Sequence, residues 1–269
     1  KCNYKCNYCF AKYDKSPKKE IHESKIETEI LLNKVYHFFI NKYKNYSIRL
    51  NIAGGEPTIS KNITFIIQKA YQIGFQVSII TNASNLTSKF IKSNAKYISL
   101  FAISIDSLDN DINTNIGRTS KHKGLESSKV IKNIELIKTL NKDLKVKVNT
   151  VVNTYNYQEN LSDFIDLIKP DKWKVLQALS FTKEVFCTDE QFELFLNNHK
   201  NTKTKIYKES NDDMTDSYIM IDPHGRFYQN TIGDYIYSKS IIDIEVCEAF
   251  NEIEFDLNKF NSRYIMEKR

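Results

Sequence analysis

The chain contains few of the residues that interrupt or cross-link a fold. Its 269 residues include only seven glycines, four prolines, five cysteines and one tryptophan. Without a glycine- or proline-rich linker, composition does not divide the chain, and one α/β unit is favoured over two small domains. Five cysteines, two of them isolated, make no disulfide framework, which indicates a reducing compartment, the cytoplasm. No apolar run is long enough for a membrane segment.

The excess of positive charge is small. There are 39 Lys and Arg against 33 Asp and Glu, a formal net charge of +6 at pH 7. Much of this excess is lysine in a chain rich in Asn, Lys and Ile, so charge alone does not predict direct binding to nucleic acid. Hydrophobic residues make up 41% of the chain, which is enough for a sizeable core.

Three of the five cysteines lie together in the string KCNYKCNYCF: Cys2, Cys6 and Cys9. The spacing C-x3-C-x2-C can bind three corners of an iron–sulfur cube and leaves the fourth iron open. An open metal position is typical of chemistry rather than of a structural site. A disulfide pair or a zinc knuckle is the alternative. Zinc knuckles need four ligands, and the nearest histidine, His22, lies in a polar stretch typical of a helix start.

Short β-rich runs alternate with amphipathic helical patterns along most of the chain. Strands are predicted at 49–53, 76–81, 98–105, 145–151, 173–177 and 218–222. Helical spacing of apolar residues is clearest at 26–39, 130–137 and 161–168, with Pro170 ending the last helix. This alternation predicts an α/β fold of parallel strands with helices outside, either barrel-like or doubly wound.

Side-chain alternation in three of these strands places cations on one face. Successive strand residues point to opposite faces, so the apolar positions oppose a polar set. The set comprises Arg49, Asn51 and Ala53, then Lys145, Lys147 and Asn149, then Lys172 and Lys174. If the apolar faces pack under helices, five cations face the interior, and uncompensated charge there requires anions. A triphosphate is the natural counter-ion. A solvated strand edge with snorkelling lysines is the alternative.

The cysteine spacing, together with AGGEP at residues 53–57, resembles the radical S-adenosylmethionine enzymes. Within that superfamily the chain resembles the viperin family, through segments in the same order over nearly its whole length. These segments are CNYKCNYCF, NIAGGEP, SIITNAS, AISIDSLD, NIGR, KVKVNTVVN, KWKVLQ, ESNDDMTDSYIMID and SKSIIDI. The resemblance implies a partial (β/α)6 barrel. Residues 1–180 would form its core, and residues 181–269 a C-terminal extension closing a nucleotide site, the two making one structural unit.

The resemblance also implies an activity. Cys2, Cys6 and Cys9 would hold a [4Fe–4S] cluster, and S-adenosylmethionine would be the radical source. The radical would take the 4′ hydrogen of a nucleoside triphosphate, and the 3′ hydroxyl would leave as water. The product would be a 3′-deoxy-3′,4′-didehydro nucleotide, an antiviral chain terminator. An electron donor of the flavodoxin or ferredoxin type is implied as partner.

Site residues follow from the same resemblance, position by position. Those expected at the cofactor are Gly54, Gly55, Glu56, Asn82, Ser104 and Arg118. The glycines would let backbone approach closely, Glu56 would accept from the cofactor's ammonium, and Arg118 would bind its carboxylate. Those expected at the substrate are Arg49, Asn51, Lys147, Asn149, Lys172, Lys174, Arg226 and Phe227, with the last two in the region that contacts the base. An ordinary glycine turn and a surface salt bridge of Arg118 are the plainer alternatives.

Some positions depart from the family pattern. Ala53 replaces a serine, and Lys172 replaces an arginine, which keeps the charge but loses bidentate phosphate binding. The stretch 179–192 is shorter than in the family, and 226–237 differs enough that CTP does not follow from the resemblance. A pyrimidine nucleotide, CTP or UTP, is the expected substrate. Two other functions stay open. A radical enzyme acting on a peptide or small molecule commonly has further cysteines, which the isolated Cys187 and Cys247 fit poorly. A catalytically silent nucleotide-binding protein should have lost a cluster cysteine or the GGEP string.

Overall fold

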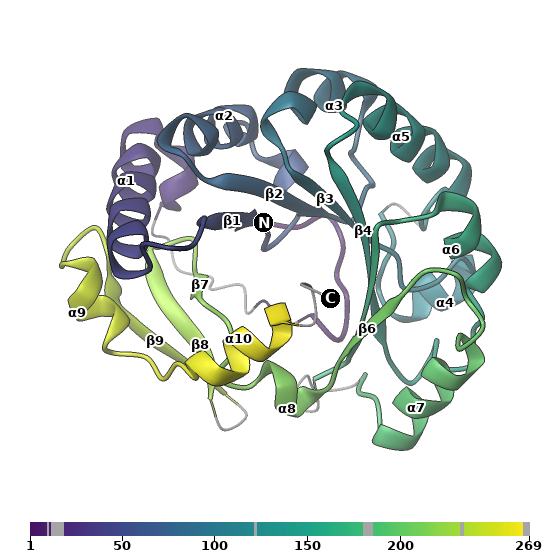
Figure 1. Cartoon of the computed structure of the whole chain (residues 1–269). Coiled ribbons are helices and arrows are strands. Elements are labelled where there is room, and N and C mark those ends of the chain that lie inside the picture. Colours follow the sequence, from purple (N-terminus) through teal and green to yellow (C-terminus); the bar gives the residue numbers. More distant parts are fainter. Residues whose placement is uncertain (10, 12–18, 121–122, 180–184, 232–233, 266–269) are drawn as a thin grey trace.

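The computed structural model describes residues 1–9, 11, 19–120, 123–179, 185–231 and 234–265. Within them, six parallel strands form one curved sheet around an interior, with helices on its outer side (Figure 1). The strands follow chain order across the sheet: β1 (Arg49–Ile52), β2 (Gln76–Thr81), β3 (Leu100–Ser104), β4 (Lys145–Val152), β5 (Lys172–Gln177) and β6 (Ile206–Glu209). Because the sheet curves but its end strands do not pair in the described part, the fold is a partial barrel.

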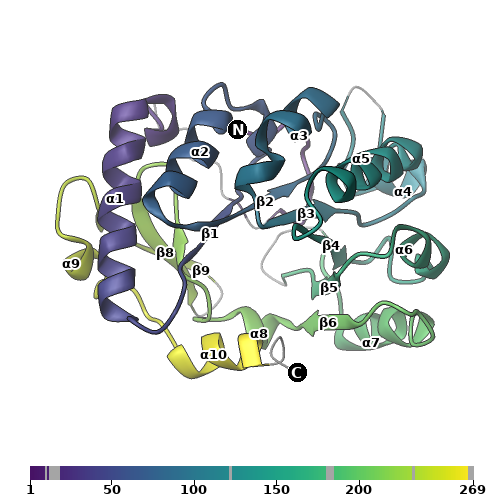
Figure 2. The same ribbon diagram turned by 45° about the horizontal axis from the view of Figure 1, so that its top comes forward.

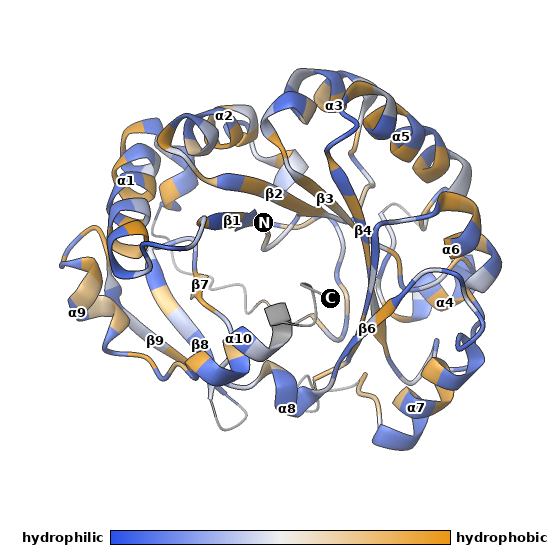
Figure 3. Cartoon of the chain, in the orientation of Figure 1, coloured by the Kyte–Doolittle hydropathy of each residue, from blue (hydrophilic) through white to orange (hydrophobic). Residues whose placement is uncertain are grey.

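Helices alternate with the strands and cover the outside of the sheet (Figure 2). The longer ones are α1 (Lys25–Lys42), α2 (Ile63–Ile73), α3 (Ser88–Asn94), α5 (Ser127–Leu140), α6 (Ser162–Ile168) and α7 (Asp189–Asn198). Short helical turns complete the barrel: η1 (Ile21–Glu23), η2 (Pro57–Ile59), η3 (Ala95–Tyr97), α4 (Asn110–Asn115) and α8 (Asn211–Met214). Ser24 caps α1 by accepting from the Glu27 N–H, and Gly74 ends α2 with φ of 119°. The outer helices show hydrophobic and hydrophilic segments side by side, as amphipathic helices do (Figure 3).

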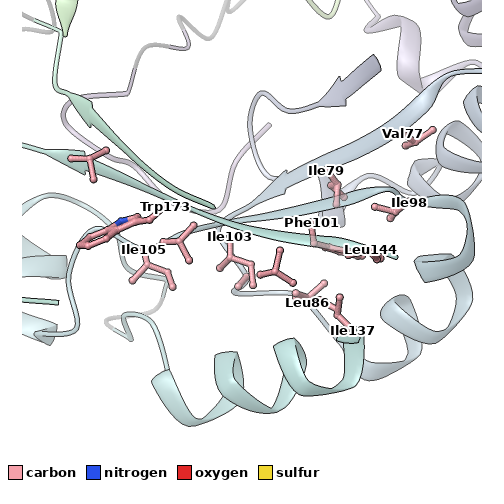
Figure 4. Packing of buried hydrophobic residues seen from close by; sticks show 14 of the residues in the cluster. Val77, Ile79, Leu86, Ile98, Phe101, Ile103, Ile105, Ile137, Leu144 and Trp173 are labelled. Carbon is pink, nitrogen blue, oxygen red and sulfur yellow. The ribbon is translucent and has the colours of Figure 1, made fainter. Parts of the chain in front are cut away.

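The main core lies between the sheet and these helices. Alternate residues of β4 and β5 are fully buried on the helix side, among them Val146, Val148 and Trp173. Phe101 and Ile103 of β3 pack in the same layer as Ile137 of α5 (Figure 4). This burial pattern leaves the polar positions of the same strands on the inner face.

A second, antiparallel sheet lies across the interior from β4 (Figures 1 and 2). It consists of β7 (Met220–Ile221), β8 (Arg226–Thr231) and β9 (Asp234–Ser240), and is followed by α9 (Val246–Phe250) and α10 (Leu257–Ile265). Phe227 joins this sheet to the helices, because its ring lies 6.3 Å from that of Phe39 in α1 and 5.3 Å from that of Phe250 in α9.

Five predicted strands coincide with β1 to β5 to within a few residues, and the predicted α/β partial barrel is confirmed. The strand predicted at 218–222 belongs to the antiparallel sheet as β7, so its place in the parallel alternation was wrong. The sequence analysis missed β6, β8 and β9. The parallel sheet continues past residue 180 into β6, and the division into two parts at that residue stays a prediction. In the described residues, no helix is long and apolar enough to span a bilayer.

Candidate active site

The segment that carries Cys2, Cys6 and Cys9 is fixed to the barrel mainly through its backbone. The Lys1 carbonyl accepts from the Glu56 N–H at 3.1 Å, just after β1. Lys5 donates to the Gly117 carbonyl at 3.1 Å, beyond α4. Within the segment, Cys9 N–H donates to the Cys6 carbonyl at 3.1 Å. The three thiols are therefore held at the ends of the strands, where parallel α/β folds place their sites.

Two glycines permit this close contact. A Cβ on Gly55 would lie 1.9 Å from the Lys1 carbonyl oxygen, and one on Gly117, which has φ of +75°, would lie 2.1 Å from that of Lys5. Both positions exclude any side chain. The structure thus gives Gly55 a role the sequence analysis did not predict, which is to admit the backbone of the cysteine segment. Gly54 has φ of +115° and faces open space.

Glu56, the acid of GGEP, is buried at the end of β1 and receives four hydrogen bonds. Its Oε1 accepts from Thr58 N–H at 3.0 Å, from the Thr58 hydroxyl, and from the Thr81 hydroxyl at 2.7 Å. Its Oε2 accepts from Asn82 N–H at 2.7 Å. These bonds exclude a plain glycine turn, because the carboxylate ties the ends of β1 and β2 together. Since a carboxylate has about four acceptor sites, Oε2 keeps room for one further donor.

Asn82, also expected at the cofactor, lies beside the first cysteine. Its Nδ2 donates to Asn3 Oδ1 at 3.1 Å and lies 4.0 Å from Cys2 Sγ. Asn3 in turn donates to the Ser84 hydroxyl at 2.8 Å. The end of β2 is therefore linked to the cysteine segment by side chains as well.

Arg118 is buried, so the interpretation as a surface salt bridge was wrong. Its guanidinium lies 3.2 Å from Asp106 Oδ2 and donates to the Ser104 carbonyl at 2.7 Å and to the Tyr8 hydroxyl at 3.1 Å. Tyr8 also donates to Asp106, and Asp106 Oδ1 accepts from Val151 N–H at 2.9 Å. The sequence analysis missed Asp106 and Tyr8. An acidic residue directly after the apolar run AISI was the available signal for Asp106.

The donor set fits an iron–sulfur cluster. Burial raises the pKa of the Cys6 thiol to about 12; the Arg118 cation lowers this pKa, while the negative charges of Asp106, Cys9 and Cys2 raise it further. No disulfide joins the described cysteines. Within the described ranges, no group of three or more His, Cys, Asp or Glu is arranged to hold a single metal ion. Three thiols on one short segment beside a buried cation match the three-thiolate cage, in which each sulfur binds a different iron.

The strand register brings the predicted substrate residues of β4 and β5 together. Lys147 is paired with Lys172, and Asn149 lies between Ser104 of β3 and Lys174 of β5. The side-chain oxygen of Asn149 is buried without a hydrogen-bond partner. The inner face thus combines cations with a buried amide oxygen that accepts no hydrogen bond within the described protein.

Two of the five predicted interior cations differ from expectation. Lys174 is not uncompensated, because its Nζ lies 2.5 Å from Glu209 Oε1 and 3.1 Å from the Tyr218 hydroxyl. Tyr218 donates to Glu209 as well, and the Lys174 and Glu209 side chains are only 13% and 10% exposed. Lys145, at the start of β4, is exposed and lies 3.1 Å from Asp171, so it shares the face of Lys147 but lies outside the enclosed part of the interior. The sequence analysis missed Glu209, since neither β6 nor its pairing was predicted. Tyr218 begins the strand predicted at 218–222, but its contact with Lys174 was not predicted.

The expected substrate residues of β1 lie on the polar face of that strand. Arg49, at its start, is exposed and donates to Gln76 Oε1 at 3.4 Å. Asn51 accepts from the Ser78 hydroxyl of β2. Lys172 Nζ lies 4.2 Å from the centre of the Tyr207 ring. Arg49 and Asn51 of β1 and Lys172 of β5 therefore belong to the same parallel sheet. Asn51 lies nearer than Arg49 to the end of β1 at which the cysteine segment is bound.

In the base region the structure separates the two expected residues. Phe227 is fully buried between α1 and α9, so the expectation that it contacts the base was wrong. Arg226 lies on the other face, 2.6 Å from Asp222 and 4.5 Å from the Tyr237 ring centre. Residues 180–184 and 232–233 of the two divergent stretches lie outside the described residues.

Comparison with known proteins places this chain in a family. The model of the Radical SAM superfamily matches residues 1–169. An S-adenosylmethionine-dependent nucleotide dehydratase of Psychrobacter lutiphocae is 39% identical over 98% of this chain and 91% of its own. That of Pseudoalteromonas ulvae is 38% identical over 98% and 89%. The chain belongs to this radical SAM family. The dehydratase RSAD2 of Oncorhynchus mykiss is 30% identical, over 97% of this chain and 76% of its own.

Solved structures support the fold. Native anSMEcpe with bound AdoMet matches with a TM-score of 0.68 at 16% identity, over 97% of this chain and 79% of that chain. Streptococcus suis SuiB bound to S-adenosylmethionine matches with a TM-score of 0.66 at 17% identity, over 97% and 64%. At such identities the likeness concerns the fold alone. As a radical SAM protein, the chain uses S-adenosylmethionine and a [4Fe–4S] cluster.

Proposed function

We propose that the protein dehydrates a nucleoside triphosphate to its 3′-deoxy-3′,4′-didehydro form. The names of its relatives support a nucleotide dehydratase. The structural observation that carries the proposal is the row Ser104–Asn149–Lys174 across three strands. It combines a buried amide oxygen that has no hydrogen-bond partner with a lysine, and its Ser104 carbonyl accepts from the buried Arg118. Such a row suits a ligand that is polyanionic at one end and rich in hydroxyl groups in its middle, as a nucleoside triphosphate is.

In this proposal, Cys2, Cys6 and Cys9 hold the cluster. The bound cluster and S-adenosylmethionine supply the one-electron chemistry that removes the 4′ hydrogen of the ribose. The side chains of the protein bind and orient S-adenosylmethionine and the substrate. The residues assigned to S-adenosylmethionine are Gly54, Gly55, Glu56, Asn82, Ser104 and Arg118. Glu56 Oε2 has room for an ammonium donor, and the buried Arg118 carries a fixed positive charge beside the cysteines.

The substrate residues lie further into the interior. Lys147, Lys172 and Lys174 bind the triphosphate, and Asn149 holds a ribose hydroxyl through its unpaired oxygen. Arg49 and Asn51 contribute from β1. Positioning the ribose within reach of the radical source, with water excluded, is the protein's main contribution to rate.

Finer features belong to the proposal as well. The base is a pyrimidine, the electron donor is a flavodoxin or ferredoxin, and residues 181–269 form an extension that closes the nucleotide site. A cytoplasmic location is supported by the five sparse cysteines, which form no disulfide framework.

An anaerobic assay tests this function. The reconstituted protein, with reductant and S-adenosylmethionine, is compared for 5′-deoxyadenosine formation with CTP, UTP, GTP and ATP. We expect strong stimulation by one of them and none in Cys6→Ser, which cannot complete the cage. If no nucleotide stimulates the wild-type protein, the proposal is wrong.

A further inference from the structure

Three side chains form a closed ring of hydrogen bonds where the end of β2 meets the cysteine segment. Asn82 Nδ2 donates to Asn3 Oδ1 at 3.1 Å, Asn3 Nδ2 donates to the Ser84 hydroxyl at 2.8 Å, and that hydroxyl donates to Asn82 Oδ1 at 2.5 Å. Each member of the ring therefore donates one bond and accepts one. Because Asn3 directly follows Cys2, the ring fixes the first cysteine relative to β2.

The backbone after Asn82 fixes the orientation of its side-chain amide. Asn82 Oδ1 accepts a second bond, from the Ser84 N–H at 2.9 Å, so the amide oxygen is held toward Ser84 and the nitrogen points away from it. Ala83, between them, has φ of 61°, a left-handed conformation that destabilises a residue other than glycine. Its N–H is held by the Thr81 hydroxyl at 3.0 Å. The fold thus keeps a strained turn, and this turn directs the Asn82 nitrogen toward the cysteine segment.

The Cys2 sulfur lies next to two nitrogen donors. An amide nitrogen carries two hydrogens, and Asn3 takes one of those of Asn82. Asn82 Nδ2 lies 4.0 Å from Cys2 Sγ, and the Tyr4 N–H donates to the same sulfur at 3.4 Å. Both donors lie in a buried environment, since Asn82 is 8% and Tyr4 4% exposed. Hydrogen bonds to an ionised acceptor are stronger than those to a neutral one, so both bonds gain strength when the sulfur is a thiolate.

We propose that Asn82 is a positioning residue that raises the reduction potential of the iron–sulfur cluster by donating a hydrogen bond to the Cys2 sulfur. Hydrogen bonds to the cysteine sulfurs are among the features that set this potential. Reduction adds one negative charge, part of which lies on the sulfurs, so a donor at Cys2 stabilises the reduced state more than the oxidised state. This role differs from the contact with S-adenosylmethionine that the resemblance implies for Asn82, and it does not depend on the identity of the substrate.

The reduction potential of the cluster-loaded protein tests this role. It is measured by electron paramagnetic resonance during an anaerobic redox titration, without S-adenosylmethionine and without nucleotide. In Asn82→Ala we expect the ratio of reduced to oxidised cluster at the wild-type midpoint to fall about tenfold, which is about 59 mV for one electron. Asn82→Asp retains an acceptor for Ser84 but replaces the donor by a carboxylate, which opposes the added electron, so the fall should be larger.

Ser84→Ala provides a matched control from the same ring. It removes the hydroxyl that joins Asn3 to Asn82 but keeps the backbone N–H that holds Asn82 Oδ1, so the Asn82 nitrogen still faces Cys2. We expect the wild-type reduction potential in Ser84→Ala, even where its unfolding temperature is lower. Iron content and the unfolding temperature are measured for every variant, so that a change in potential is compared between proteins that carry the same amount of cluster.

Three results would overturn the inference. If both Asn82 variants keep the wild-type potential and only bind S-adenosylmethionine more weakly, the amide acts on the cofactor and not on the cluster. Equal shifts in Ser84→Ala and Asn82→Ala would mean that the ring acts only by holding the segment in place. Failure of both Asn82 variants to bind iron would assign the amide to cluster assembly. Because the titration contains no nucleotide, none of these results bears on the proposed dehydration, and a failed dehydration assay leaves the measured potentials unchanged.

Discussion

Replacing Lys147 and Lys174 by alanine, one at a time, tests the proposed triphosphate site, and Lys174 adds a second effect because its Nζ lies 2.5 Å from Glu209 Oε1. Each lysine is proposed to bind phosphate through a charge-assisted hydrogen bond, which contributes about 1.5–3 kcal/mol. Lys147→Ala should therefore weaken triphosphate binding by roughly 10- to 150-fold. Its effect on the free energy of unfolding should be smaller than its effect on binding, since Lys147 lies on the polar inner face of β4 and outside the apolar core.

Lys174→Ala should be more severe. It removes the same phosphate contact and also leaves the Glu209 carboxylate, 2.5 Å from Lys174 Nζ in the structure, facing the bound phosphates. Breaking a mostly buried ion pair by removing one partner destabilises a protein by about 3–5 kcal/mol.

Glu209→Gln provides the control. Alone, it should tighten triphosphate binding, because Lys174 no longer shares its charge with a carboxylate. Combined with Lys174→Ala, it should return affinity and stability toward the Lys147→Ala values. The measurements are calorimetric titration with nucleotide on the unreduced, cluster-loaded protein and urea unfolding monitored by circular dichroism. Wild-type affinity in both single lysine variants would refute the reasoning.

Three other predictions concern the scaffold of the site. Gly55→Ala and Gly117→Ala should each lower iron content after reconstitution, because their Cβ atoms would meet the backbone of the cysteine segment at 1.9 and 2.1 Å; normal iron loading in both would contradict this. Asp106→Ala should lower the free energy of unfolding by about 3–5 kcal/mol in urea, since Arg118 is then left buried without its carboxylate; a change below about 1 kcal/mol would argue that the pair contributes little. Burial lowers the pKa of His199, whose Nε2 accepts from Leu161 N–H at 2.8 Å, so the unfolded chain binds the proton more readily. Stability should therefore fall as the pH drops below about 6.5, by at most about 1.4 kcal/mol per pH unit, and His199→Gln should reduce that slope.

The strands of the barrel could be predicted because each is a short apolar alternation between helical patterns. β4 shows this best, since its buried valines alternate with Lys145, Lys147 and Asn149 on the other face. The same parity placed Lys147 and Lys174 in the interior. Strand alternation could not show that Lys145 lies at the exposed start of β4. Alternation determines the face on which a side chain lies, but not how far along the strand that face is enclosed.

The parts that could not be predicted depend on tertiary pairing. Glu209 reaches Lys174 only because β6 pairs with β5. The segment IYKE, which forms β6, is too short and too polar to be predicted as a strand from its sequence. Phe227 was assigned to the base by resemblance, yet strand parity in β8 turns it toward α1 and turns Tyr228 and Asn230 inward. Asp106 and Tyr8 lie 98 residues apart in sequence, and no local pattern links them.

The central claim is that the cluster held by the three cysteines, together with S-adenosylmethionine, supplies a radical that reacts with the ribose of a nucleotide. The cations on the inner face of the sheet bind that nucleotide. The most direct test uses the stimulating nucleoside triphosphate carrying deuterium at the ribose 4′ position, in a single turnover under anaerobic conditions. Mass spectrometry then follows the label. We predict that deuterium appears in 5′-deoxyadenosine and that the nucleotide product has lost both the deuterium and the 3′ hydroxyl group. Unlabelled 5′-deoxyadenosine with intact nucleotide would contradict the claim.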